Sequence, residues 1–255
     1  MATLGLIGFG ALGQGLVAAL AGRGHDWVLL RRPGSTRAVP DGLRTVDDLP
    51  ALLAARPAAV IEAAGQSAVA ACVPAVLRAG IPVVLASTGA LSDAALRDGL
   101  LRAAQTPGAR LVIPSGAIAG LDYLRAVAPL DGVRIRYTSR KPVAAWAAEL
   151  AALGLDPGSL RSEVVLFDGT AEAAALRYPR NLNVALTLAL TAPQAGLSVR
   201  VLADPAATGN GHEIDIDSPA GSASFRMVNA PAPGNPKTSL LTGLSLRAAV
   251  EELLP

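Results

Sequence analysis

The first half of the chain alternates short apolar runs with segments in which apolar residues recur at helical spacing. The runs predict strands, and they are Thr3–Gly8, Trp27–Leu30, Ala58–Ile61, Pro82–Leu85 and Arg110–Ile113. The intervening segments predict helices over Ala11–Ala21, Leu49–Ala55, Ala68–Arg78 and Ser92–Ala104, with Ser92 as the expected N-cap of the last helix. Strands alternating with helices in this way predict a parallel sheet that helices cover on both faces.

The pattern changes after Pro114. Alternation of apolar and polar residues predicts half-exposed strands of antiparallel type at Val133–Thr138, Val164–Phe167, Leu197–Leu202, Glu213–Asp217 and Ala223–Val228. Helical spacing covers Ala119–Val127 and Pro179–Thr191, and the tail from Thr238 to Leu253 is also predicted to be a helix, one that returns to the first domain. We therefore expect two domains, residues 1–113 with 239–255 and residues 114–238, the second of α+β class.

Composition supports a folded protein with no nucleic-acid or membrane partner. Hydrophobic residues make up 51% of the 255 and charged residues 16%, which argues against disorder, and aromatic residues are only 3%. The net charge is +2, and the sequence has no cluster of basic residues interleaved with aromatic residues, which is the pattern typical of nucleic-acid binding. The uncharged stretch 181–199 is broken by Asn183 and Pro193, so its apolar part is too short to span a bilayer.

The start of the chain and its single cysteine indicate where the protein works. The first residues run directly into a strand pattern without a basic segment, so no signal peptide is visible. Cys72 is the only cysteine, which excludes a disulfide within the chain and suits a reducing compartment. Cys72 is also a poor candidate for a catalytic thiol, because no histidine lies near it in sequence. We expect a cytoplasmic protein.

A glycine-rich loop follows the first predicted strand. Gly8, Gly10 and Gly13 form a G-x-G-x-x-G with Ala11 and Leu12, and this motif lies between a strand and a helix, the context that a dinucleotide requires. Gly8 permits the tight turn, Gly10 lets a pyrophosphate approach the backbone, and Gly13 allows the helix to pack closely on the strand. The N-terminus of the helix supplies N–H groups for the phosphates. The loop predicts a Rossmann-type, doubly wound sheet that binds NAD or NADP.

The end of the second predicted strand bears on the choice of cofactor. NAD enzymes keep an acidic residue there for the ribose 2′-hydroxyl, whereas this chain has Arg31 and Arg32. Guanidinium groups bind phosphate through paired hydrogen bonds, so we expect NADP to be preferred over NAD. Ser35, Thr36 and Arg37 are further possible donors if the Pro33–Gly34 turn folds over the phosphate. The alternative is a solvated pair of arginines on a loop.

Small polar segments follow the third and fourth predicted strands, at the edge of the sheet where ligands bind. Ala64, Gly65 and Gln66 form the first segment, and Ser87, Thr88 and Gly89 form the second; both suit a cofactor that lies against the backbone. Glu62 is either an acid catalyst or, as we favour, a supporting carboxylate. The segment Pro114–Asp122, which follows the fifth strand, suits either a ligand contact or a hinge.

His212 is one of only two histidines and stands where a Gly-Asn-Gly run meets an alternating segment. Histidine titrates near neutral pH and is the side chain that most often donates and accepts protons in enzyme active sites. The other histidine, His25, precedes the second predicted strand and is remote from the expected chemistry. A surface position in a loop is the alternative for His212.

Taken together, these segments resemble the L-aspartate dehydrogenase family from end to end. The resemblance is carried by Gly8–Gly13, Glu62–Gln66, Ser87–Leu91, Pro114–Asp122, Thr138–Pro142, Tyr178–Val184, Gly211–Ile214 and Asn235–Ser239, in this order and spacing. The Asn210-Gly211-His212 sequence keeps the family's asparagine two residues before its histidine. The arginines after the second strand depart from the acidic ending that is commoner in the family.

The resemblance implies the chemistry and the remaining site residues. It implies that His212 is catalytic, that Ala117 and Asn183 contact the cofactor, and that the substrates are a dicarboxylate and ammonia. L-Aspartate and oxaloacetate would interconvert through iminosuccinate by hydride transfer, with no metal. The candidates for substrate binding in family-like segments are Arg140, Lys141, Asn235, Lys237 and Thr238. A homodimer is expected.

Two alternatives from other classes remain open at this point. One is another two-domain Rossmann reductase, but a semialdehyde enzyme needs a cysteine at a strand end, and a dihydrodipicolinate-type enzyme needs a stretch rich in histidine and lysine. The other alternative is a sensor that binds NADP without turning over a substrate.

Overall fold

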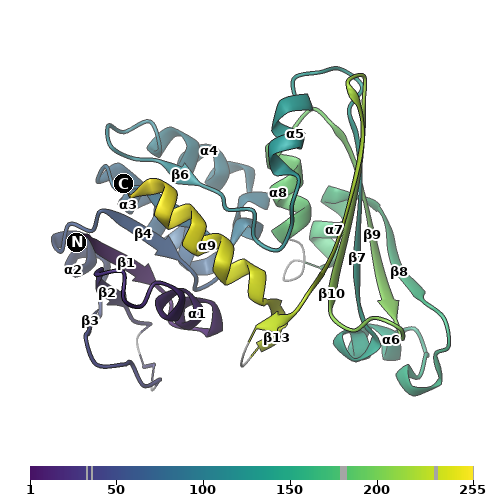
Figure 1. Ribbon diagram of the computed structural model, residues 1–255, viewed down its shortest axis with the longest axis horizontal. Helices are drawn as coiled ribbons and strands as arrows, with labels where there is room; N and C mark the ends of the chain where they lie inside the picture. Colours follow the sequence, from purple (N-terminus) through teal and green to yellow (C-terminus); the bar gives the residue numbers. More distant parts are fainter. Residues whose placement is uncertain (33, 36, 179–182, 233–234, 255) are drawn as a thin grey trace. The chain divides into compact units, whose positions relative to one another are not determined.

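The structure is a computed structural model that describes residues 1–32, 34–35, 37–178, 183–232 and 235–254 (Figure 1). The chain divides into two compact units, one of Met1–Gly116 with Thr242–Pro255 and the other of Ala117–Leu241. We refer to them as the N-unit and the C-unit and describe each separately.

The N-unit contains a six-stranded sheet in the order β3-β2-β1-β4-β5-β6, in which every pair of neighbours is parallel. This is the strand order of the dinucleotide-binding Rossmann fold, with the change of direction between β1 and β4. The strands are β1 (Thr3–Ile7), β2 (Asp26–Leu30), β3 (Leu43–Val46), β4 (Ala59–Glu62), β5 (Val83–Leu85) and β6 (Leu111–Val112).

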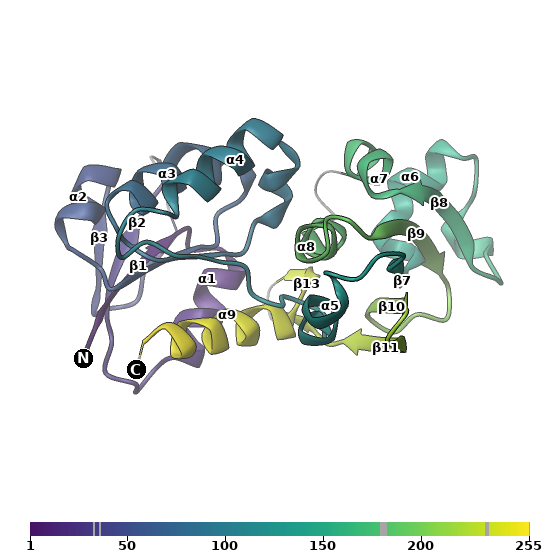
Figure 2. The same cartoon turned by 90° about the horizontal axis from the view of Figure 1, so that it is seen from above.

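Helices cover both faces of this sheet, as Figure 2 shows: α1 and α9 lie on one face, and α3 and α4 on the other. The helices are α1 (Ala11–Ala19), α2 (Leu49–Ala54), α3 (Gln66–Arg78), α4 (Ala94–Ala103) and α9 (Leu240–Leu253), with a short 3₁₀ helix at Thr88–Ser92. Leu16 of α1 and Leu246 of α9 pack with Leu4, Leu29 and Ile61 of the sheet. Apolar strands buried on both faces explain why the predicted strands read as continuous hydrophobic runs.

Two details of the N-unit differ from the sequence prediction. The edge strand β3 was not predicted, because its four residues carry no apolar run and its two central residues are exposed. The predicted N-cap Ser92 is wrong: Asp93 caps α4 by accepting a hydrogen bond from the Leu96 N–H at 3.1 Å. The Ser92 hydroxyl instead donates to the Gly89 carbonyl at 2.9 Å.

The C-unit contains a five-stranded sheet in the order β11-β10-β7-β9-β8. The strands are β7 (Arg134–Pro142), β8 (Val164–Thr170), β9 (Gly196–Asp204), β10 (Asn210–Ser218) and β11 (Gly221–Asn229), and a separate small ladder joins β12 (Pro231–Ala232) to β13 (Asn235–Ser239). The pairing of β7 with β9 is parallel, whereas the other pairs of the large sheet are antiparallel. Alternation indicates one exposed face and not the direction of the neighbouring strand, so the prediction of antiparallel strands is wrong for the pair of β7 and β9.

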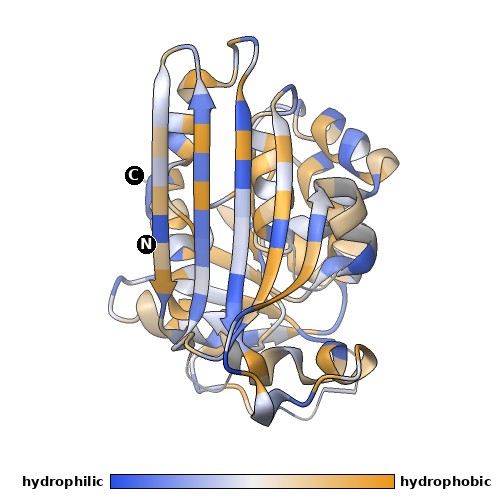
Figure 3. Ribbon diagram, turned by 90° about the vertical axis from the view of Figure 1, so that its right-hand side faces the viewer, coloured by the Kyte–Doolittle hydropathy of each residue, from blue (hydrophilic) through white to orange (hydrophobic). Residues whose placement is uncertain are grey.

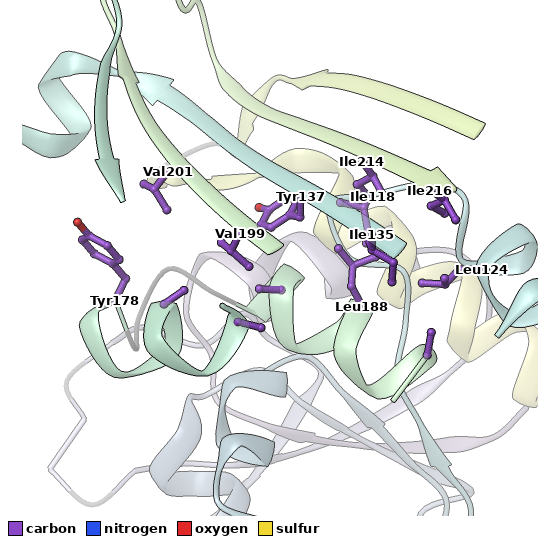
Figure 4. Packing of buried hydrophobic residues seen from close by; sticks show 14 of the residues in the cluster. Ile118, Leu124, Ile135, Tyr137, Tyr178, Leu188, Val199, Val201, Ile214 and Ile216 are labelled. Atoms are coloured by element: carbon purple, nitrogen blue, oxygen red, sulfur yellow. The ribbon is translucent and has the colours of Figure 1, made fainter. Parts of the chain in front are cut away.

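Helices pack on one face of the C-unit sheet and enclose a core. They are α5 (Leu121–Val127), α6 (Ala147–Ala152), α7 (Ala171–Arg177) and α8 (Asn183–Thr191), with 3₁₀ turns at Val143–Trp146 and Pro157–Ser159. Figure 4 shows Leu124 and Leu188 of the helices against Ile135, Val199 and Ile214 of the strands. Hydrophilic and hydrophobic residues alternate along these strands (Figure 3), and exposed residues such as Arg134, Arg136 and Asp215 belong to the other face. Helices α6 and α7 were not predicted, and the first four residues of the predicted helix 179–191 lie outside the described residues.

The predicted fold class, a doubly wound parallel sheet with a second α+β part, is confirmed by these two sheets. In the described parts of the chain, no helix has both the length and the apolar character that crossing a bilayer demands.

Candidate active site

The glycine loop has the geometry that a dinucleotide needs. Gly8 has φ +94°, and a Cβ atom there would lie 2.6 Å from the Ala64 Cα. A Cβ on Gly13 would lie 2.4 Å from the Gly8 carbonyl oxygen, so both glycines are required by close backbone packing. A Cβ on Gly10 would meet nothing within 4 Å. The space beside Gly10 is therefore open to a ligand.

The first turn of α1 faces the same loop. Gly10 is the N-cap of α1 and makes no side-chain capping bond, and the first intrahelical hydrogen bond runs from the Gln14 N–H to the Gly10 carbonyl at 2.9 Å. The N–H groups of Ala11, Leu12 and Gly13 precede that bond and have no acceptor within the helix. Such groups, together with the positive end of the helix dipole, bind phosphate.

A pocket beside the loop is lined by basic residues from the end of β2. It contains Gly8, Phe9, Gly10, Leu29, Arg31, Arg32, Ser35, Arg37, Val39, Ala63 and Ala64, with no carboxylate among these lining residues. The Arg31 guanidinium donates to the Ser35 carbonyl oxygen. Arg32 and Arg37 are exposed. Two predicted contributors, Pro33 and Thr36, lie outside the described residues.

Glu62 connects the two loops predicted to hold the cofactor. Its fully buried carboxylate accepts hydrogen bonds from the N–H groups of Ala64 and Gly65 at 2.8 Å, from the Ser87 N–H at 3.0 Å and from the Ser87 hydroxyl at 3.0 Å. Burial raises the pKa of Glu62, and these four bonds oppose that shift. Because these four hydrogen bonds are all with the two loops, Glu62 acts as a brace at the ends of β4 and β5, the supporting role that we favoured.

The remaining residues of the two loops lie where helices begin. Gly65, with φ +134°, is the N-cap of α3, and Gln66 is its first residue. Thr88 and Gly89 are buried in the 3₁₀ helix that follows β5. Both segments thus present backbone turns at the carboxyl edge of the sheet.

His212 lies on β10 in the C-unit and is buried, with 6% of its surface exposed. Its partner in register on β7 is Ser139. The His212 Nδ1 atom is 2.9 Å from the Tyr137 hydroxyl, and the two rings are nearly parallel, with an angle of 13° between their planes. The surface-loop alternative for His212 is therefore wrong, because the Gly-Asn-Gly run ends inside the sheet.

Lys141 lies on the same face of the sheet as His212, since it is two residues beyond Ser139 on β7. It is 8% exposed, and its Nζ atom lies 5.3 Å from the centre of the Trp146 ring. Burial, and to a lesser extent the positive charge of Lys141, lower the pKa of His212 to about 4. The imidazole is therefore neutral at pH 7 and can accept a proton.

Arg140 points to the opposite face and is surrounded by acids. Its guanidinium pairs with Glu163, with Asp204 at 2.8 Å and with Glu213 at 3.2 Å. The hydrogen bond with Glu163 is the largest cause of a raised Arg140 pKa. Three carboxylates already neutralise this cation, so it is poorly available to a dicarboxylate substrate.

The other predicted residues of the C-unit are spread over several elements. The Ala117 carbonyl accepts a hydrogen bond from the Asn229 side chain at 2.7 Å, and Asn183 begins α8. Thr238 is half-buried on β13, whose backbone also includes Asn235 and Lys237. The side chains of Asn235 and Lys237 lie outside the described residues.

Sequence reasoning gave no role to several buried polar residues of the C-unit: Tyr137, Ser139, Asn210 and Asn229. A signal for the first two was present. The alternation predicted for 133–138 continues through Lys141, which places Tyr137, Ser139 and Lys141 on one face and Arg140 on the other. No comparable signal marked Asn229, whose contact with Ala117 bridges 112 residues of sequence.

The chain matches two family models. Residues 122–253 match the model described as aspartate dehydrogenase, C-terminal, and residues 8–114 match the homoserine dehydrogenase NAD-binding domain. It is 46% identical to L-aspartate dehydrogenase 2 of Bordetella bronchiseptica, over 98% of this chain and 96% of the relative. It is 36% identical to the L-aspartate dehydrogenase of Pseudomonas aeruginosa, over 98% and 97%.

Solved structures give the same result. Aspartate dehydrogenase from Thermotoga maritima superimposes with a TM-score of 0.80 at 28% identity, covering 100% of this chain and 97% of that one. An archaeal homoserine dehydrogenase reaches a TM-score of 0.59 at 12% identity, covering 99% and 97%, and shares the fold alone. A dihydrodipicolinate reductase from Paenisporosarcina reaches 0.52 at 11%, covering 98% and 95%, and it too shares only the fold. The predicted resemblance is confirmed: this chain belongs to the L-aspartate dehydrogenase family.

Proposed function

We propose that this protein is an NAD(P)-dependent L-aspartate dehydrogenase in which His212 is the acid–base catalyst. The observation that carries the proposal is the buried, neutral His212 on the same sheet face as Lys141, in a unit that matches the C-terminal family model. In the oxidative direction L-aspartate loses a hydride from C2 and a proton from its amine, which gives iminosuccinate. Water then adds to C2, and ammonia leaves to give oxaloacetate.

His212 serves the step that involves water. As the water oxygen bonds to C2 of the imine, the imidazole accepts one of its protons. In the reductive direction the imidazolium returns that proton to the departing hydroxyl, which leaves as water. A pKa of about 4 in the free protein favours the base form. Two substrate carboxylates nearby would offset the charge of Lys141 and raise the pKa toward neutrality, as the acid form requires.

Lys141 is the cation that we favour for binding a substrate carboxylate. It shares the face of His212 and is buried, so that water screens its charge less than at the surface. The acids around Arg140 make that residue the weaker candidate. Lys237, Asn235 and Thr238 stay predictions of the family resemblance.

The residues of the N-unit fit a dinucleotide. When bound, NAD(P) supplies the hydride acceptor or donor of the reaction. The Gly8–Gly13 loop and the first turn of α1 would hold its pyrophosphate, and the loops that Glu62 braces would position the nicotinamide end. Contacts from Ala117 and Asn183 stay predictions of the resemblance.

We further propose that NADP is preferred over NAD. The pocket at the end of β2 is lined by Arg31, Arg32 and Arg37, with no carboxylate among its lining residues to repel a 2′-phosphate. Each charge-assisted hydrogen bond contributes roughly 1.5–3 kcal/mol, enough for about tenfold or more in affinity. The bond from Arg31 to the Ser35 carbonyl holds this guanidinium at the pocket while other donor hydrogens remain.

The domain roles, oligomeric state and location follow the same proposal. Residues 1–113 with 239–255 would bind the dinucleotide, and residues 114–238 would bind the dicarboxylate and ammonia. A homodimer in the cytoplasm stays a prediction.

The test is NAD(P)H oxidation with oxaloacetate, with and without ammonia. We expect oxidation that requires ammonia and yields L-aspartate. His212→Ala should reduce turnover by roughly 10²–10⁴-fold, the usual contribution of a general acid–base. His25→Ala is the matched control and should retain activity. Oxidation without ammonia, or near-normal turnover of folded His212→Ala, would contradict the proposal.

A further inference from the structure

Tyr137 and His212 form a buried pair inside the C-unit sheet. Tyr137 is fully buried on β7, one step along the same face from Ser139, the register partner of His212. Figure 4 shows the Tyr137 ring within the core of the C-unit. The hydroxyl lies 2.9 Å from His212 Nδ1. The imidazole is thus held from one side by a residue that sequence reasoning overlooked.

This contact distinguishes the two ring nitrogens. Within the described residues, the His212 ring makes one hydrogen bond, and this bond joins its Nδ1 atom to the Tyr137 hydroxyl. The hydrogen bond at one nitrogen of a histidine sets which form the other presents. If Nδ1–H donates to the Tyr137 oxygen, the Nε2 lone pair is left for proton transfer.

We propose that Tyr137 is a positioning residue that holds the His212 imidazole in the Nδ1–H tautomer, so that Nε2 is the nitrogen that exchanges the proton. This rests on the proposed acid–base role of His212. In the oxidative direction Nε2 accepts the proton that the attacking water loses as its oxygen bonds to carbon. In the reverse direction the same proton returns from Nε2 to the departing hydroxyl. Nδ1 keeps its hydrogen throughout, so one arrangement with Tyr137 serves both directions.

A phenol suits this role better than a carboxylate. A carboxylate beside Nδ1 would stabilise the imidazolium and oppose the low pKa of His212. Burial instead raises the pKa of the Tyr137 hydroxyl well above its usual value, so the group remains neutral and takes no proton from the ring. Lys141 is the charged group that acts on His212, and Tyr137 adds no charge of its own.

The experiment compares Tyr137→Phe with Tyr178→Phe. Both changes remove one buried hydroxyl from the same core, but the Tyr178 hydroxyl donates to the Leu166 carbonyl at 3.2 Å and makes no contact with His212. We expect kcat to fall by roughly 10–100-fold in Tyr137→Phe, with the KM for NADPH little changed. The ionisation in the pH profile of kcat/KM should also shift. Tyr178→Phe should keep both the rate and the profile.

A second readout does not depend on activity. The chain has only two histidines, so a His25→Gln background leaves His212 as the sole source of imidazole ¹⁵N signals. At neutral pH we expect the hydrogen on Nδ1 in the otherwise unchanged protein, and a shift toward Nε2–H in Tyr137→Phe. Nε2–H in the unchanged protein, or the same tautomer in both proteins, would overturn the inference.

The two proposals fail in different ways. Normal turnover of His212→Ala would remove the acid–base role itself. Impaired His212→Ala combined with a Tyr137→Phe variant that has normal rate, pH profile and tautomer would overturn only the role of Tyr137.

Discussion

At the scale of the residue, the environment of His212 matters more than its rarity. Histidine in water titrates near pH 6.5, which would suit a group that both gives and takes protons. Here burial and Lys141 bring its pKa down to about 4. The His212 imidazole is therefore neutral in the free protein at pH 7, and in the mechanism that we propose substrate binding raises its pKa so that it can act as an acid.

This shift gives a stability prediction. Because the folded pKa of about 4 lies below the ordinary histidine value of 6.5, the unfolded chain binds more protons between these values. Stability from His212 is therefore present above pH 6.5 and is lost as the pH falls toward 4, by up to about 3 kcal/mol. Urea unfolding across this window should show a smaller loss in His212→Gln than in the parent protein. His25→Gln serves as control, and equal slopes in all three proteins would contradict the shift.

Arg31 and Arg32 give a second prediction at this scale. Removing both guanidiniums in Arg31→Ala/Arg32→Ala should lower kcat/KM for NADPH relative to NADH by about tenfold or more. Arg102→Ala, at an exposed position in the last turn of α4, should leave the ratio unchanged. A parent protein that prefers NADH, with a ratio unaffected in the double variant, would show that the pair is only surface charge.

At the scale of the element, one side chain joins the loops that follow β4 and β5. The regular backbone hydrogen bonds between parallel strands stop near the strand ends, so the loops beyond them need other contacts to fix their positions. Glu62 supplies such contacts, because its carboxylate accepts hydrogen bonds from three backbone N–H groups and one hydroxyl. The brace fixes two loops that the proposed cofactor would touch.

Glu62→Gln tests the brace. The glutamine oxygen can still accept from Ala64 and Gly65, but the amide nitrogen would face the Ser87 N–H, so one buried donor is left without an acceptor. We expect a stability loss of about 1–3 kcal/mol and a higher KM for the cofactor. The exposed Glu252→Gln on α9 is the control. A Glu62→Gln protein as stable as that control would show that the brace contributes nothing.

At the scale of the whole molecule, we expect the dinucleotide to bind residues of one unit and the dicarboxylate substrate to bind residues of the other. The glycine loop and the arginine pocket belong to the N-unit, and His212 with Lys141 belongs to the C-unit. The C-terminal helix α9 brings the end of the sequence to its beginning, because Leu246, Ala249 and Val250 pack in the core around β1.

Hydrogen exchange can separate these contributions. NADPH should protect the amides of Gly8–Gly13 and of the residues after β2, because bound phosphate uses those N–H groups. Succinate, a dicarboxylate without an amine, should protect β7 and β10 around Lys141 and His212, and Lys141→Gln should abolish that effect. Protection of β7 and β10 that persists in Lys141→Gln would assign the substrate carboxylate to another residue.

The local patterns of the sequence determined the fold class, the glycine loop and the histidine. Apolar runs alternating with helical spacing specify a parallel sheet, and a G-x-G-x-x-G between strand and helix specifies the turn beside a phosphate, since both depend on residues close in sequence. Tertiary structure alone decided the rest. Glu62 contacts Ser87, Tyr137 contacts His212, and Arg140 forms ion pairs with acidic residues from three other segments. These contacts join residues 23 to 75 positions apart, and their hydrogen bonds and burial, which set the charge and orientation of the groups, exist only after the sheets have formed.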